Sequence, residues 1–206
     1  MRNAAARKIT DEAEQQQSKL LQALFPHPDD CDRLTVLHIG PALQPTLDFF
    51  SNYRCQLHIR DLFAELPLPA PDAEDESPEL VLAQAMQIPQ DTRFDICLFW
   101  DWLNFLDAQA LTAFLEQLAP HLHRNTLAHA YAVHNLRSRR AHNVYGVSTS
   151  DTIAVKPRSR PVPGYSPHSQ RKLKELMFCL DVQRSVLLPD GRLELLLQTK
   201  KMRQDA

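Results

Sequence analysis

LTVLHIG, residues 34–40, is the stretch that decides the fold, because it is a short apolar run that ends at a glycine. Such a run, with little polar alternation, is typical of a parallel strand that is buried on both faces. A helical stretch from Pro45 to Tyr53 follows, and then a second strand over Cys55–Ile59. A strand, a helix and a strand in this order predict two parallel strands joined by a crossover helix.

The same alternation continues toward the C-terminus. Further strands are expected over Leu80–Ala85, Phe94–Trp100 and Leu127–His134, with helices over Asp107–Leu118 and from Ser166, where Pro167 would take the first helical position. The turn Pro189-Asp190-Gly191 separates the apolar stretches Phe178–Leu188 and Arg192–Thr199, which predicts an antiparallel hairpin. In a sheet of this kind, ligands bind at the carboxyl ends of the parallel strands.

The length of 206 residues suits one domain with one sizeable core. Residues 1–28 are expected to form a polar helix, with the residues before Thr10 lacking fixed structure, because apolar positions recur there at roughly helical spacing. Residues 29–204 would form the domain itself, with a basic insertion over residues 137–165.

Hydropathy and cysteine usage indicate a cytosolic protein that makes no membrane contact. No apolar run approaches the roughly 20 residues that span a bilayer, and the opening residues contain no apolar export segment. The four cysteines, Cys31, Cys55, Cys97 and Cys179, form no CxxC pair, which favours reduced, mostly buried thiols over disulfides or a metal site.

The element order resembles that of the class I S-adenosylmethionine-dependent methyltransferases over about residues 30–200. The resemblance implies an α/β, three-layer, doubly wound fold. Its mostly parallel, seven-stranded sheet would end in a C-terminal antiparallel hairpin. It also implies S-adenosylmethionine as the cofactor.

Four residues of this chain match places where that family holds its cofactor. Gly40 and Ala42 lie in the loop that resembles the family's glycine-rich turn, in which only the first glycine remains and His38 replaces the preceding acid. Asp61 lies 21 residues beyond Gly40, close to the spacing of roughly 20 residues at which a carboxylate binds the ribose hydroxyls. Gln84 stands where the family has an acid that meets the adenine amino group.

The end of the fourth expected strand resembles the place where the family transfers the methyl group. Asp101 is the candidate catalytic residue there, because a carboxylate can orient or deprotonate a nucleophile. Trp100 and Trp102 are candidate substrate contacts, because indole rings stack on planar groups. Core packing is the alternative for both aromatic side chains.

Residues 137–174 hold nine basic residues and one acid, a balance of +8, whereas residues 1–136 balance at −10. Such a segment attracts phosphate groups or acidic protein surfaces. It is therefore the candidate contact for a protein partner or a phosphate-bearing ligand, RNA included, and a solvated loop is the alternative. The candidate contact residues are Arg137, Arg139, Arg140, Arg158 and Arg160.

These features favour a divergent methyltransferase-like protein, a pseudoenzyme with weak or absent cofactor binding that acts through partner contacts. Two alternatives stay open. One is an active methyltransferase on a small molecule, RNA or protein, and the other is an adaptor for nucleic acid or acidic proteins, in which side chains fill the former pocket. A filled pocket would exclude the enzyme.

Overall fold

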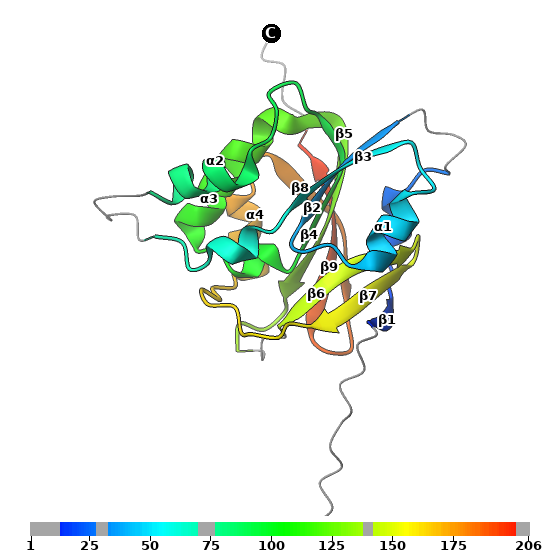
Figure 1. Cartoon of the computed structure of the whole chain (residues 1–206). Coiled ribbons are helices and arrows are strands. Elements are labelled where there is room, and N and C mark those ends of the chain that lie inside the picture. Colours follow the sequence, from blue (N-terminus) through cyan, green and yellow to red (C-terminus); the bar gives the residue numbers. More distant parts are fainter. Residues whose placement is uncertain (1–12, 28–32, 70–76, 138–141, 201–206) are drawn as a thin grey trace, which may run out of the picture.

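The computed structural model describes residues 13–27, 33–69, 77–137 and 142–200. Two sheets organise this part of the chain (Figure 1). The larger has the strand order β3-β2-β4-β5-β9-β8, and the smaller has the order β1-β7-β6. The strands are β1 (Glu14–Gln17), β2 (Leu34–Ile39), β3 (Cys55–Arg60), β4 (Phe94–Trp100), β5 (Leu122–Val133), β6 (Asn143–Thr149), β7 (Thr152–Pro157), β8 (Leu180–Leu187) and β9 (Arg192–Thr199).

The larger sheet is mixed, as the sequence predicted. Strands β3, β2, β4 and β5 pair in parallel, whereas β9 pairs antiparallel with both β5 and β8. The turn between β8 and β9 holds Gly191 at φ 84°, a backbone conformation that glycine adopts without strain. The predicted α/β class and the C-terminal antiparallel hairpin are therefore confirmed.

The sheet has six strands in the described residues, and the prediction of a third parallel strand over Leu80–Ala85 is wrong. These residues lie in helix α2 (Pro78–Met86). The hydroxyl of Ser77 accepts a hydrogen bond from the Leu80 amide, and Pro78 takes the first helical position. Both are helix-start signals, and they determine the structure of this short apolar run.

The expected N-terminal helix is also wrong within residues 13–27. Glu14–Gln17 forms strand β1, which pairs antiparallel with β7, and only Leu21–Leu24 makes a 3-10 turn. The backbone of the glutamine-rich run finds hydrogen-bond partners in a distant strand, and this tertiary pairing overrides helical spacing. Residues 1–12 lie outside the described part.

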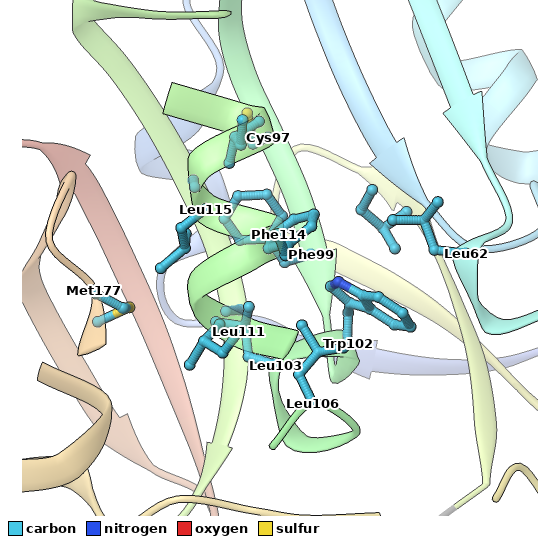
Figure 2. Close-up of a cluster of buried hydrophobic side chains, with 14 of the residues drawn as sticks. Leu62, Cys97, Phe99, Trp102, Leu103, Leu106, Leu111, Phe114, Leu115 and Met177 are labelled. Carbon is cyan, nitrogen blue, oxygen red and sulfur yellow. The ribbon is translucent and has the colours of Figure 1, made fainter. Parts of the chain in front are cut away.

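Helices α2, α3 (Ala108–Leu118) and α4 (Gln170–Leu176) cover one face of the large sheet (Figure 1). Figure 2 shows their core, in which Phe99 of β4 packs edge-on against Phe114 of α3 at 5.6 Å between ring centroids. Helix α4 begins at Gln170 with Ser169 as its N-cap, later than the predicted start at Ser166.

The opposite face is covered by helix α1 (Gln44–Phe50) and by the small sheet (Figure 1). The fold is thus doubly wound, but a β-layer replaces much of the helical cover that a three-layer fold of this class implied. This layer comes from the basic insertion, which forms the hairpin β6–β7. Its side chains Tyr145, Val147 and Ile153 are buried against the large sheet.

Gly146 is the point at which β6 lies closest to α1. A Cβ atom added there would lie 2.3 Å from Thr46 Oγ1 and 3.2 Å from Leu43 Cβ. The Thr46 hydroxyl cannot move freely, because it accepts a hydrogen bond from the Val147 amide at 3.0 Å.

We expect Gly146→Ala to lower the free energy of unfolding by about 1–3 kcal/mol, the usual cost of overpacking. Urea denaturation measures the loss. Thr46→Ala is the matched second variant, because it removes the clashing oxygen. The double variant should lose less unfolding free energy than the sum of the losses in the two single variants. A loss equal to that sum would contradict the contact between Gly146 and Thr46.

No helix in the described residues is long and apolar enough to cross a membrane. Cys97 and Cys179 are free thiols, and Cys97 is buried. Cys31 lies outside the described part.

Candidate functional site

Three parallel strands end side by side, and each delivers a residue that the sequence singled out. Gly40 follows β2, Asp61 follows β3, and Asp101 follows β4. The Gly40 amide donates a hydrogen bond to the Arg60 carbonyl at 2.7 Å, which fixes the ends of β2 and β3 together. The predicted location of the site, at the carboxyl edge of the sheet, is where these residues meet.

The side of Gly40 on which a Cβ atom would lie faces two side chains. Gly40 has φ 103°, so a glycine suits the turn. A Cβ atom added there would lie 3.4 Å from Phe63 Cε2 and 3.9 Å from Arg158 Nη2. Two side chains of this chain therefore occupy the space over the glycine.

Arg158 reaches this place from the residue that follows β7. Its guanidinium carbon lies 4.0 Å from the centroid of the Phe63 ring, a cation–π contact. Its Nε donates to the Asn143 carbonyl at 3.0 Å, and its backbone amide donates to the His142 carbonyl. The hairpin thus holds the arginine over the ring, where Asp61 and Asp101 attract its positive charge.

Phe63 lies on the 3-10 helix Leu62–Glu65, and its ring packs edge-on against Trp102 and Phe105 at 5.1 and 5.4 Å. Among the described residues, Gly40, Phe63, Asp101 and Arg158 line a closed space too small for a water molecule.

Asp101 is buried at the bottom of this closed space. Its Oδ1 atom has no hydrogen-bond partner in the described part of the chain. Burial raises the pKa of Asp101 to about 7, although the positive charge of Arg158 opposes the rise. The candidate catalytic carboxyl is therefore partly protonated at neutral pH and sealed from solvent.

We expect Asp101→Asn to raise the free energy of unfolding at pH 9 by about 1–3 kcal/mol, on the scale of 1.36 kcal/mol per pKa unit. The native carboxyl holds its proton more tightly than the unfolded chain does. Wild-type stability therefore falls as the pH rises from about 4 through 7. Urea denaturation of wild type and variant at pH 4 and pH 9 measures the unfolding free energy below and above this pH range. If wild type and Asp101→Asn differed in unfolding free energy by the same amount at both pH values, the raised pKa of Asp101 would be contradicted.

Trp100 and Trp102 are buried, and Trp100 lines the same closed space as Asp101; their contact with a substrate stays a prediction. Their residual exposures are 1% and 0%. Trp100 stacks on Tyr145 at 5.8 Å, and its Nε1 lies 3.4 Å from His38 Nδ1. Trp102 packs among the side chains below α3 (Figure 2).

His38, which replaces the acid of the resembled motif, also belongs to the core. It is fully buried, and burial lowers its pKa to about 4, so the ring is neutral and can accept the indole hydrogen bond. Trp100 adopts φ 52°, which strains a bulky residue by about 1–3 kcal/mol. The packing around these rings holds Trp100 in that conformation.

The remaining candidates lie away from the closed space. Ala42 is half-buried in the loop before α1 and does not line the space, and Gln84 is exposed on α2. Arg137 is exposed, with its amide bound to the Asn135 side chain. Arg139 and Arg140 lie outside the described residues.

An open groove of about 590 Å³ lies beside the closed space, on the outer side of Phe63 and Arg158. Its basic side chains are Lys156, Arg158 and Arg160, of which Arg160 is exposed. Asp61 is exposed and lines the same groove. The structure therefore brings Asp61 together with two of the predicted arginines.

No protein-family model matches this sequence, and the search of curated proteins gives no match. The fold is similar to that of a mitomycin 7-O-methyltransferase (TM-score 0.47, 13% identity), over 87% of this chain and 52% of that one. It is also similar to the 1,6-didemethyltoxoflavin-N1-methyltransferase of Burkholderia thailandensis (TM-score 0.46, 14% identity, 89% and 78% of the chains). A third similar structure is the N-methyltransferase NodS of Bradyrhizobium japonicum (TM-score 0.47, 13% identity, 88% and 93%).

The chain thus spans about half the length of the first of these proteins. All three are methyltransferases. The methyltransferase-like fold expected from the sequence agrees with the observed strand order, in which parallel strands precede an antiparallel pair. At such low identity the likeness concerns the fold alone.

Proposed function

We propose that this chain is a methyltransferase-like protein that does not transfer methyl groups, and that it acts in the cytosol by binding a phosphate-bearing partner. The site of binding is the groove lined by Lys156, Arg158 and Arg160. One observation carries the first half of the proposal: Phe63 and Arg158 fill the space over Gly40.

The charge and place of the groove support the second half. Its basic side chains outnumber the one acid, Asp61, and guanidinium groups bind phosphate oxygens in pairs. A volume of about 590 Å³ suits a small ligand or one group of a larger partner. The groove also lies at the carboxyl edge of the sheet, where α/β folds bind ligands.

Inorganic pyrophosphate is the probe for this proposal, titrated by calorimetry at 50 and 200 mM salt. We expect binding that weakens with salt and that Arg160→Gln weakens by about tenfold, the effect of losing one charge-assisted hydrogen bond. Arg124→Gln is the matched control, because Arg124 is an exposed arginine at the opposite edge of the sheet. If both variants lost the same pyrophosphate affinity, or if the wild-type protein did not bind pyrophosphate, the groove would not be the binding site.

Asp61→Asn separates this proposal from the enzyme alternative. Asp61 repels an anion in the groove, so its neutral variant should bind pyrophosphate about threefold more tightly at low salt. A ribose-binding carboxylate would instead leave pyrophosphate unaffected and weaken S-adenosylmethionine.

The active enzyme remains the second candidate because of Asp101. A buried carboxyl with its pKa near 7 at the end of β4 is the kind of group that performs acid–base chemistry. This function requires Phe63 and Arg158 to leave their positions over Gly40, so binding of the cofactor decides between the two candidates.

A further inference from the structure

A second cavity, of about 880 Å³, lies at the opposite edge of the large sheet. It is bounded by the start of β5, by the end of β9 and by the segment between α4 and β8. The groove described above lies where the parallel strands end, whereas this cavity lies where β5 begins. The two sites share no lining residue.

The walls of the cavity are largely apolar. Phe178 is 45% exposed although it is a large aromatic residue, and Leu122 and Ala119 line the cavity with it. Cys179 adds to this wall, because burial raises the pKa of its thiol to about 11 and keeps the sulfur uncharged. An apolar body placed in the cavity would cover the exposed Phe178 ring.

Two polar groups of the lining are suited to bind an acid. The Arg124 guanidinium is exposed, with no ion pair among the described residues, and Thr199 Oγ1 is buried without a hydrogen bond. The other two basic groups are engaged, since Lys200 Nζ donates to the Met177 carbonyl at 2.8 Å and His123 Nε2 lies 3.0 Å from Asp95. A guanidinium and a hydroxyl are therefore left to bind an acceptor.

We infer that this cavity binds a small organic acid with an apolar body. The body packs on Phe178 and Leu122, while Arg124 and Thr199 donate hydrogen bonds to the carboxylate. A guanidinium matches a carboxylate in geometry and charge, and a buried hydroxyl without a partner gains a hydrogen bond when the acid enters. The inference is independent of the proposed function, because it concerns a different site.

Decanoate and 2-naphthoate are the probes, and they distinguish a chain-shaped from a ring-shaped body. Calorimetry on the full-length protein should show binding of at least one acid. Arg124→Gln should weaken that binding by about tenfold, the effect of losing a charge-assisted hydrogen bond, whereas Phe178→Ser should weaken it by the loss of apolar contact. The uncharged analogues, decanol and 2-naphthol, should bind less tightly and be insensitive to Arg124→Gln.

Arg184→Gln is the matched control, because it removes an exposed arginine of β8 that lines neither the cavity nor the groove. Both exposed positions tolerate substitution, so folding does not confound the comparison. Absence of binding by both acids at millimolar concentration would overturn the inference. Binding that Arg124→Gln and Phe178→Ser leave unchanged would overturn it as well.

Discussion

Glu194→Gln is expected to lower the free energy of unfolding at pH 7 by about 1.5–3 kcal/mol, the range for hydrogen bonds to a charged group. Glu194 of β9 is fully buried and lies 3.0 Å from His129 Nε2. Its carboxylate also accepts hydrogen bonds from the Ser18 hydroxyl and from the Lys19 amide. These hydrogen bonds join the N-terminal segment to the large sheet, so the variant should weaken the contact between them.

The same network makes the loss of unfolding free energy in Glu194→Gln depend on pH. Burial opposes ionisation of Glu194, but the hydrogen bond and charge of His129, with Ser18 and Lys19, outweigh it and hold the pKa at about 2. A carboxyl with a lowered native pKa stabilises the fold above its unfolded value, 4.5, and this contribution disappears as the pH falls toward 2.

Urea denaturation at pH 7 and pH 3 compares wild type and variant. The difference in unfolding free energy should shrink at pH 3. Glu175→Gln is the control, because Glu175 forms an exposed pair with Arg171 and should cost no more than about 0.5 kcal/mol. A difference that is the same at both pH values would contradict the ionised state of Glu194.

Phe63→Ala is expected to lower the free energy of unfolding by about 3–5 kcal/mol, as for other buried aromatic residues. The ring is 6% exposed and contacts Trp102, Phe105 and the guanidinium of Arg158. Its removal leaves a cavity beside Gly40 and takes away the surface on which Arg158 rests.

Thermal or urea denaturation measures this loss. Phe178→Ala is the matched control, because its ring is 45% exposed and its removal should cost less than about 1 kcal/mol. A loss at Phe63 no larger than that at Phe178 would show that the ring does not fill the site as described.

The parallel strands and the closing hairpin could be predicted because their signals are local. Apolar runs such as Phe94–Trp100 and the turn at Gly191 determine their own structure, and the observed elements match them. The strand β1 could not be predicted, because its glutamine-rich sequence becomes a strand only by pairing with β7. Helix α2 had local signals in Ser77 and Pro78, but the apolar run beside them suggested a strand.

The candidate site shows the same division. Strand order places Gly40, Asp61 and Asp101 at one edge of the sheet, and this could be predicted from spacing. The closure could not, because Phe63 and Arg158 are distant in sequence and meet only when the hairpin β6–β7 folds onto the sheet. The burial of the two tryptophans could not be predicted either, because an apolar strand end looks the same in sequence whether its side chains pack inward or line a pocket.

The central claim is that side chains of this chain occupy the place of the cofactor. Calorimetric titration of the purified protein with S-adenosylmethionine tests it most directly. We predict no binding at millimolar ligand, because Phe63 and Arg158 contact the space over Gly40 and the closed space that they line has no room for a water molecule. Binding in the micromolar range, roughly −8 kcal/mol, that Asp61→Ala weakens would contradict the claim and restore the enzyme.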